Sequence, residues 1–357
     1  MMSASLSPEN RARLLRGMVI PAHPLALTAA RRLDERRQRA LTRYYSEAGS
    51  GGLAVGVHTT QFEIHDPAVG LYRPVLELAA ETMDACDEQR AEPLFRIAGI
   101  VGRTAAAVAE AELAVGLGYH AGLVSLSAFK EAGDADMVDH LRAVSAVIPV
   151  VGFYLQPAVG GRRLGVDFWR EVAALPGLVA IKVAPFNRYD SIDVARAVAE
   201  SGRAEDLALY TGNDENIYLD LLTRYRFGGE GQPEVAFRGG LLGQWAVWTR
   251  RAVEHFEELR ALRESGAAIP ADWLTVAQQL TDANAVVFDA ANQFAGCITG
   301  IHEVLRRQGL LEGIWTLNPA EGLSPGQAEA LDRIEAAYPH LHDNAFVEER
   351  LDGWLRD

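Results

Sequence analysis

Lysine is almost absent from this sequence of 357 residues. Only Lys130 and Lys182 occur, against 32 arginines. Arginine stays charged in proteins, whereas a lysine amine can lose its proton and form an imine with a carbonyl group. Because arginine fills nearly every other cationic position, we expect a lysine kept inside an apolar segment to serve chemistry. The alternative is a structural lysine, paired with a carboxylate at the end of a strand.

Cysteine and long apolar runs are also scarce. Cys86 and Cys297 lie far apart and belong to no metal-ligand or redox spacing, which indicates two reduced thiols. No apolar run reaches the length of a membrane span, and residues 1–18 are polar and charged, without the apolar stretch of a signal peptide. The sequence therefore predicts a cytoplasmic protein with no membrane partner.

The charge balance is acidic. The formal net charge is −14, with 49% hydrophobic and 23% charged residues. A chain of this composition is typical of a soluble globular protein, and its charge disfavours nucleic acid as the main partner. The length suits one large α/β domain or two smaller ones.

Short apolar segments alternate with amphipathic segments over residues 17–264. The expected strands cover residues 18–22, 53–59, 94–98, 122–127, 150–155, 179–183, 207–211 and 235–238. Helical patterns follow them over residues 31–48, 75–88, 104–115, 136–147, 167–174, 192–200, 215–225 and 244–263. Eight strand–helix units predict an α/β fold, a (β/α)₈ TIM barrel. A doubly wound sheet is the alternative, but no GxGxxG follows the first strand.

The residue patterns at the two ends of this sequence differ from the strand–helix alternation of residues 17–264. Residues 1–16 are expected to form a tail. Residues 265–357 show only helical patterns, over 271–311 and 324–355, and are predicted to be a C-terminal α-helical extension.

Strand alternation places Lys182 inside the predicted barrel. In residues 178–184 the large apolar side chains occupy odd positions, so Lys182 and its small neighbours Ala180 and Ala184 should face the axis. The same reasoning places five other residues inward: Gly152, Tyr154, Ala54, Gly56 and His58. The pair Thr59-Thr60 would lie at the carboxyl-terminal rim, where such barrels carry their sites.

Several motifs occur in the order and spacing of a known family. The chain resembles the dihydrodipicolinate synthase / N-acetylneuraminate lyase family of class I, lysine-dependent barrel aldolases. The resemblance runs through most of residues 17–250. Its motifs are Ile20-Pro21-Ala22-His23-Pro24-Leu25, Val57-His58-Thr59-Thr60-Gln61, residues 98–104, Phe153-Tyr154-Leu155-Gln156-Pro157, Ala180-Ile181-Lys182 and Thr211-Gly212-Asn213-Asp214.

The resemblance implies specific roles. Lys182 would attack the ketone of a 2-oxo acid to give a Schiff base, and Tyr154 would move protons. Thr59 and Thr60 would hold the substrate carboxylate. The remaining expected substrate-binding residues are His58, Gly212 and Lys130. The family needs no metal or cofactor and forms dimers and tetramers, so a homo-oligomer is expected.

The sequence departs from the family at several positions. Gln61-Phe62 replaces Gly-Glu, and the family's tyrosine pair falls on Phe129 and Lys130. The arginine that follows the catalytic tyrosine falls on Val159, with Arg162 or Arg163 as candidate substitutes. These changes argue against dihydrodipicolinate synthesis itself. Lys130 either binds a second carboxylate or a phosphate, or is a solvated loop lysine; the sequence leaves both open.

The predicted function is a Schiff-base-dependent aldolase, lyase or dehydratase acting on a 2-oxo acid. A protonated imine serves cleavage, condensation and dehydration alike, so the sequence does not choose among them. One alternative is a barrel that binds a 2-oxo acid without turnover. Another is a metal-dependent lyase, for which His58, His65 and Asp66 are the loosely spaced candidate ligands. The pair Asn213-Asp214 reads as a helix N-cap.

Overall fold

The computed structural model describes residues 3–228 and 233–356. The chain divides into two compact units. Unit 1 comprises Met1–Met18, Phe95–Asn213 and Ile217–Leu241, and unit 2 comprises Val19–Leu94, Asp214–Asn216 and Leu242–Asp357.

The order of elements confirms the (β/α)₈ barrel fold. Eight strands are each followed by a helix: β1 (Val19–Pro21) and α2 (Glu35–Ala48), β2 (Gly52–Val55) and α3 (Tyr72–Asp87), β3 (Phe95–Ile100) and α4 (Thr104–Gly116), β4 (Ala121–Val124) and α5 (Asp134–Ser145), β5 (Val150–Leu155) and α6 (Val166–Ala173), β6 (Leu178–Ala184) and α7 (Arg188–Glu200), β7 (Ala208–Thr211) and α8 (Ile217–Leu222), β9 (Glu234–Leu242) and α9 (Thr249–Ser265). The strand β8 (Arg224–Arg226) pairs antiparallel with β9 where the sequence predicts the end of a helix.

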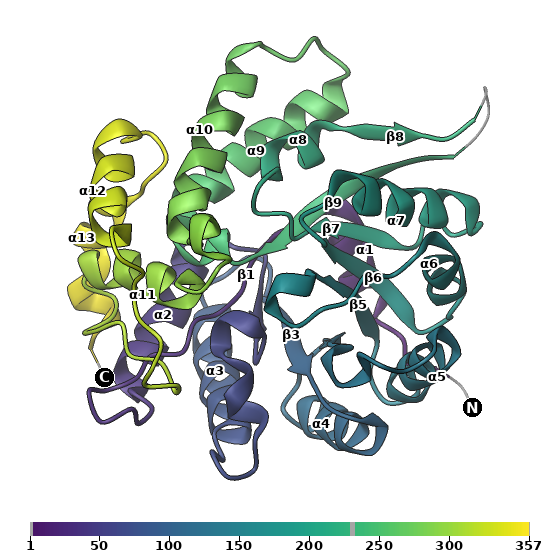
Figure 1. Ribbon diagram of the computed structural model, residues 1–357, viewed down its shortest axis with the longest axis horizontal. Helices are drawn as coiled ribbons and strands as arrows, with labels where there is room; N and C mark the ends of the chain where they lie inside the picture. Colours follow the sequence, from purple (N-terminus) through teal and green to yellow (C-terminus); the bar gives the residue numbers. More distant parts are fainter. Residues whose placement is uncertain (1–2, 229–232, 357) are drawn as a thin grey trace. The chain divides into compact units, whose positions relative to one another are not determined.

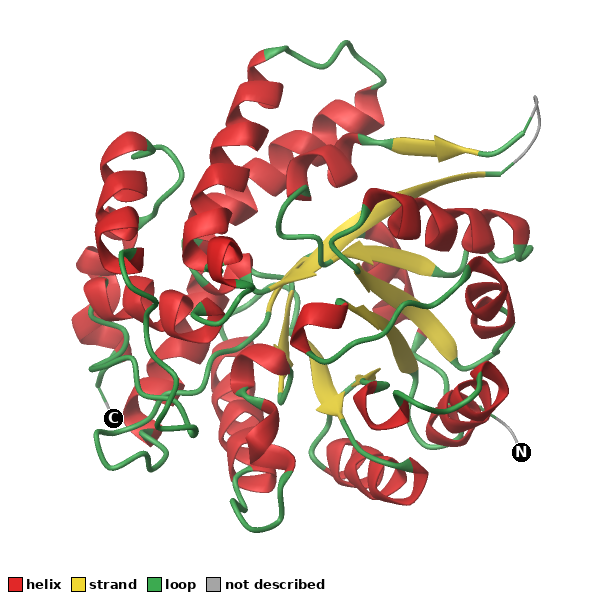
Figure 2. Ribbon diagram, viewed as in Figure 1, coloured by secondary structure: helices red, strands yellow, loops and turns green. Residues whose placement is uncertain are grey.

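Unit 1 contains six parallel strands in the order β3-β4-β5-β6-β7-β9. Figure 1 shows β5, β6 and β7 side by side, and Figure 2 shows the helices that follow these strands on their outer side. Both faces of the strands are buried, as is typical of parallel sheets.

The pairing of β5 with β6 contains an irregularity. Val150 pairs with Leu178, but Val151 pairs with Ala180, so Val179 is an extra residue on β6. Such a bulge changes which residues of two strands stand opposite each other.

The segment expected to be a tail contains a helix. Ser7 caps α1 (Pro8–Arg16) by accepting from the Asn10 amide, and proline occupies the first helical position. Gly17 ends the helix at φ 97°, where a Cβ would lie 2.0 Å from the Arg238 carbonyl oxygen, so only glycine fits.

Unit 2 carries β1 and β2 with their helices and the C-terminal extension. The Gly51 amide donates to the Val19 carbonyl, and Ala22 bridges Ala54. The extension contains α10 (Asp272–Val287), α11 (Cys297–Arg307), α12 (Gln327–Ala337) and α13 (Asn344–Trp354). The single helix expected over residues 271–311 is therefore two, because the chain enters the left-handed region at Asp289, Gln293 and Phe294.

The extension caps a barrel helix. Trp248, with φ 54°, precedes α9 and provides no side-chain cap, and the first amides of any helix lack intrahelical partners. The Asp343 carboxylate accepts from the Arg250 amide at 2.9 Å, and the Tyr44 hydroxyl accepts from the Thr249 amide at 2.8 Å. Tyr44 in turn donates to Asp343 at 2.8 Å. Asp343 is thus a helix cap supplied from almost a hundred residues away.

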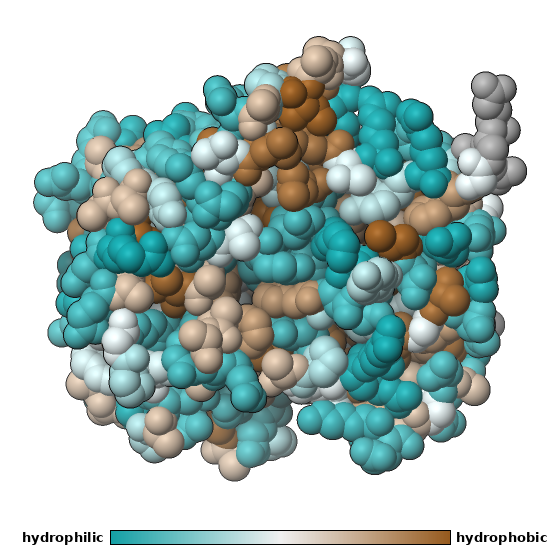
Figure 3. Space-filling model, turned by 45° about the horizontal axis from the view of Figure 1, so that its top comes forward, coloured by the Kyte–Doolittle hydropathy of each residue, from teal (hydrophilic) through white to brown (hydrophobic). Residues whose placement is uncertain are grey.

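The turn between α9 and α10 exposes apolar side chains. Ile269 and Leu274 are exposed there, and Figure 3 shows hydrophobic residues gathered over this end of unit 2. In the part of the chain that the structure describes, no helix is both long enough and apolar enough to cross a membrane.

Candidate functional site

Lys182 lies in the middle of β6 and is almost buried, with 7% of its surface exposed. Its neighbour Ile181 faces the helices, since the outer side of β5 at Gly152 contacts both Ile181 and Trp169 of α6. Alternation then turns Lys182 to the inner face. The predicted inward orientation of Lys182 is confirmed.

Gly212 makes room for the lysine side chain. A Cβ at Gly212 would lie 2.7 Å from Lys182 Cε, 3.2 Å from Lys182 Cγ and 2.8 Å from the Ala184 Cβ. These distances are well inside van der Waals contact. The absence of a side chain at residue 212 is therefore a requirement of the observed lysine conformation.

Phe153 provides the aromatic face beside the amine. It is the register partner of Lys182, and the Nζ atom lies 4.5 Å from the ring centroid. A cation over a phenyl face is stabilised by about 0.5–2 kcal/mol, the larger figure applying away from water. The sequence prediction missed this residue because a phenylalanine in a strand reads as ordinary core.

The predicted inward orientation of Tyr154 is wrong. Its register partner is Val183, and its ring packs 5.3 Å from Trp169 on the outer, helix-facing side. The hydroxyl donates to the Leu164 carbonyl at 3.2 Å and accepts from the Leu164 amide at 3.0 Å. Burial raises the pKa of Tyr154 to about 12. The parity argument failed because Gly152, taken as an inner residue, instead leaves space for the Trp169 indole.

A buried carboxylate organises the ends of β6 and β7. Asp220 is fully buried, and its Oδ2 accepts from the Thr211 hydroxyl at 2.6 Å and from the Asn213 amide group at 3.0 Å. Arg188 forms an ion pair with the other oxygen. Asn213 also accepts from the Phe186 amide at 3.3 Å. Asn213 is therefore not the helix N-cap that the sequence predicts. It links the end of β6, the strand that carries Lys182, to the end of β7.

The candidate anion-binding residues of unit 1 have other roles or lie on the surface. Lys130 is exposed. The Arg162 guanidinium donates to the carbonyls of Phe129, Lys130 and Ala132, which ties down the loop after β4. Arg163 is largely exposed and pairs with Asp190 at 3.1 Å.

In unit 2, Thr60 closes the turn that follows β2. The hydroxyl donates to the His23 carbonyl at 2.7 Å and accepts from the amides of Gly56 and Val57 at 3.0 and 3.2 Å. A hydroxyl has one donor and two acceptor positions, so this one is saturated. Thr60 thus holds the shape of the turn. Thr59 precedes it in the same 3₁₀ turn (His58–Thr60) and is buried.

His58 lies outside β2, which ends at Val55, so strand alternation does not apply to it. The ring is partly exposed and packs edge-on against Phe62 at 5.6 Å. The His65 Nε2 atom lies 2.8 Å from the Gly56 carbonyl oxygen. Among the residues that the structure describes, no cluster of three histidine, cysteine or acidic side chains is placed to bind a metal ion.

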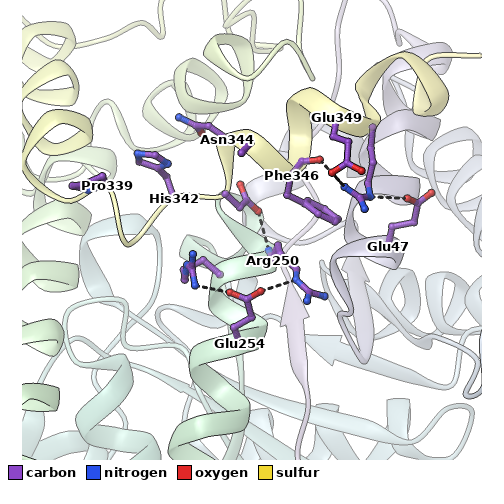
Figure 4. A pocket seen from close by; sticks show the side chains of 12 residues that line it. Glu47, Arg250, Glu254, Pro339, His342, Asn344, Phe346 and Glu349 are labelled. Carbon is purple, nitrogen blue, oxygen red and sulfur yellow. Dashed lines mark hydrogen bonds and ion pairs between the residues drawn. The ribbon is translucent and has the colours of Figure 1, made fainter.

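A polar hollow of about 690 Å³ lies elsewhere in unit 2 (Figure 4). Arg250 and Arg251 both pair with Glu254, at 2.9 and 2.6 Å. Arg350 lies 4.4 Å above the Phe346 ring. These contacts lie within α9 and within α13, and the Arg250 guanidinium, 5.9 Å from the Phe346 ring centroid, joins the two helices. None of the hollow's residues belongs to the motifs that the sequence singles out.

Solved structures share this fold. A dihydrodipicolinate synthase from Oceanobacillus iheyensis superimposes with a TM-score of 0.72 at 18% identity, over 92% of this chain and 99% of that one. An N-acetylneuraminate lyase from Fusobacterium nucleatum gives 0.69 at 15% identity, over 91% and 99%. An Acinetobacter baumannii dihydrodipicolinate synthase, complexed with pyruvate, gives 0.71 at 17% identity, over 90% and 98%. Neither a family model nor a curated protein sequence matches this chain.

The class that these comparisons define is the (β/α)₈ barrel in the form used by dihydrodipicolinate synthases and N-acetylneuraminate lyases. At such low identity the similarity establishes the fold, and the chemistry has to be argued from the residues themselves.

Proposed function

We propose that this protein is a lysine-dependent aldolase, lyase or dehydratase of a small 2-oxo acid, with Lys182 as the nucleophile. The observation that carries the proposal is the setting of that lysine. It is one of two in the chain, it lies on the inner face of β6, and Gly212 leaves its side chain room. A buried lysine beside small neighbours is the arrangement that imine chemistry requires.

The chemistry follows from an amine attacking the C2 ketone. Nitrogen bonds to carbon, the ketone oxygen leaves as water, and the resulting imine carries a positive charge when protonated. That cation withdraws electrons from the adjacent bond and stabilises the carbanion equivalent at C3. The Phe153 ring, 4.5 Å from Nζ, supports positive charge on this nitrogen.

A substrate carboxylate needs hydrogen-bond donors. The resemblance assigns this role to Thr59 and Thr60, and His58 and Lys130 remain candidates for contacts farther along the substrate. Because the Thr60 hydroxyl is saturated, Thr60 would contribute through its backbone rather than its side chain. We also propose that the chain forms a homo-oligomer, which sedimentation would test.

The imine chemistry also needs a group that donates and accepts protons. Tyr154, which the resemblance assigns to this role, bonds Leu164 on the outer side of β5. This placement favours a second candidate function, a barrel that binds a 2-oxo acid as an imine without turning it over.

Borohydride trapping tests the proposal. The protein is incubated with pyruvate and a panel of longer 2-oxo acids, reduced, and analysed by intact mass and peptide mapping. We expect one adduct, on Lys182, with Lys130 as an internal control and Lys182→Arg unlabelled. Absence of any adduct on folded protein would leave the mechanism without its nucleophile. Adding aldehydes to the imine before reduction separates the two candidates, since only an enzyme consumes the imine within one turnover.

A further inference from the structure

The polar hollow at α9 and α13 lies wholly within unit 2. Its volume of about 690 Å³ falls in the range of small-molecule pockets, which is roughly 300–1,000 Å³. Arg250 and Arg251 line it from the first turn of α9, and Arg350 lines it from α13. What such a cavity can bind depends on which of its charges and donors remain after the side chains have paired with one another.

Arg250 and Arg251 share one carboxylate. The Arg250 Nε atom pairs with Glu254 Oε1 at 2.9 Å, and a terminal nitrogen of Arg251 pairs with Glu254 Oε2 at 2.6 Å. Two guanidinium charges therefore face one carboxylate charge. Because Arg250 uses only Nε here, no group in the described part of the chain accepts from its two terminal nitrogens, and 43% of the side chain is exposed. Such a pair of parallel donors is the group by which arginine binds phosphate and carboxylate oxygens.

The neighbouring histidines respond to the same excess of positive charge. Burial, Arg251 and His340 lower the pKa of His255 to about 4, and only Glu254 acts in the opposite direction through its charge. Burial, Arg251 and His342 lower the pKa of His340. The cationic groups at this end of the hollow thus repel one another, although the chain as a whole carries a formal net charge of −14. A bound anion would relieve that repulsion.

Two of the hollow's carboxylates lie with a cation of their own. Arg350 pairs with Glu349 at 2.7 Å and lies 3.8 Å from Glu47. Figure 4 shows Glu47 and Glu349 on one side of the hollow and His342 on the opposite side. The hollow therefore has an acidic end and a basic end, and an anion would bind at the basic end.

The first turn of α13 adds donors to the basic end. Its N-cap residue, Asp343, makes no side-chain cap to α13, because its carboxylate accepts from the Arg250 amide, from Tyr44 and from Gln308. Residues 344–346 follow Asp343 and line the hollow. The first amides of a helix lack intrahelical partners and favour a nearby anion.

We propose that the basic end of this hollow binds a phosphate group, with the terminal nitrogens of Arg250 as its principal donors. A carboxylate has two oxygens, which one guanidinium would satisfy, whereas a phosphate has further oxygens for the amides of α13. The group belongs either to inorganic phosphate or to a small organic phosphate, whose remainder the volume of the hollow would accommodate. This site is independent of Lys182 and of the imine chemistry proposed for it.

Calorimetry with inorganic phosphate tests the site, at an ionic strength held constant with sodium chloride. We expect saturable binding by the wild-type protein and binding weakened about tenfold or more in Arg250→Gln, since hydrogen bonds to a charged group are lost. Arg250→Lys keeps the charge without the paired donors and should also weaken binding. Urea unfolding establishes that the variants are folded.

Arg260 offers a matched control. It lies on the same helix and pairs with a glutamate three residues away, Glu257, but does not line the hollow. Arg260→Gln should bind phosphate like the wild type. No saturable binding by the wild type, or equal binding by the wild type and Arg250→Gln, would overturn the inference. Glycerol phosphate identifies the source: tighter binding than inorganic phosphate assigns the site to an organic phosphate, and equal or weaker binding assigns it to free phosphate.

Discussion

Substituting Gly212 by alanine tests the geometry around the lysine most directly. The added methyl group would lie 2.7 Å from Lys182 Cε and 2.8 Å from the Ala184 Cβ. The lysine can rotate away, but Ala184 is fixed to β6, so the strands or the side chain must shift. Inserting a methyl group into such packing costs about 1–3 kcal/mol, offset by about 0.4–1 kcal/mol from the stiffer unfolded chain.

The effect on chemistry should exceed the effect on stability. A misplacement of the reacting atom by about 1 Å can cost about 100-fold in rate. We therefore expect Gly212→Ala to fold, with a free energy of unfolding lowered by at most about 2.6 kcal/mol, and to be trapped by borohydride about 100-fold more slowly. Urea unfolding and the rate of adduct formation with pyruvate give the two quantities.

Gly116 provides the control. It ends α4 on the surface, and a Cβ there meets nothing within 4 Å. Gly116→Ala should leave trapping unchanged. If Gly212→Ala were trapped at the wild-type rate, the lysine conformation described above would be irrelevant to reactivity, and the reasoning would be refuted.

Three further predictions concern stability and the roles of other residues. Tyr154→Phe should lower the free energy of unfolding by about 1–3 kcal/mol, by leaving the Leu164 backbone unpaired, while imine formation on pyruvate continues; loss of trapping without loss of stability would restore the acid–base role. Asp220→Asn should cost about 1–3 kcal/mol in urea unfolding, because the new NH₂ group cannot accept from the donors that the buried carboxylate bonds, whereas Arg188, 36% exposed, keeps contact with water. A change under about 0.5 kcal/mol would contradict the importance of this buried carboxylate. Burial lowers the pKa of His23 from 6.5 to about 4, so between these values the unfolded chain binds a proton at His23 that the folded chain does not. His23 alone should therefore lower the free energy of unfolding by about 1.4 kcal/mol per pH unit as the pH falls below 6.5, and His23→Gln should reduce the total slope, to which His140, His255 and His302 also contribute, by that amount.

The sequence predicts the fold better than it predicts side-chain directions. Strand β5 is found at the predicted residues 150–155, and seven other strands lie within a few residues of their predicted places. Periodicity and turn residues are local signals, so they survive in a single sequence. The antiparallel β8 was missed because its pairing with β9 is a tertiary contact.

The direction of a strand residue depends on its neighbours. Lys182 was placed correctly since large side chains flank it on the helix side. Tyr154 was placed wrongly because the space outside Gly152 is filled by Trp169, a residue of the next helix, and nothing within the strand reveals this. The Gln61 side chain accepts a hydrogen bond from the Leu317 amide, 256 positions away in sequence. Contacts between residues so far apart in the sequence cannot be predicted from local residue patterns.

The cap on α9 has a consequence for how the protein is made. Asp343 follows Arg250 by 93 positions, yet it satisfies the start of a helix that belongs to the barrel. During synthesis the amino-terminal parts of a chain emerge first and begin to fold. The first amides of helix α9 would therefore face water until the segment that carries Asp343 has been made. Chains that stop before residue 343 would lack this cap, so a late segment completes a helix of the barrel region.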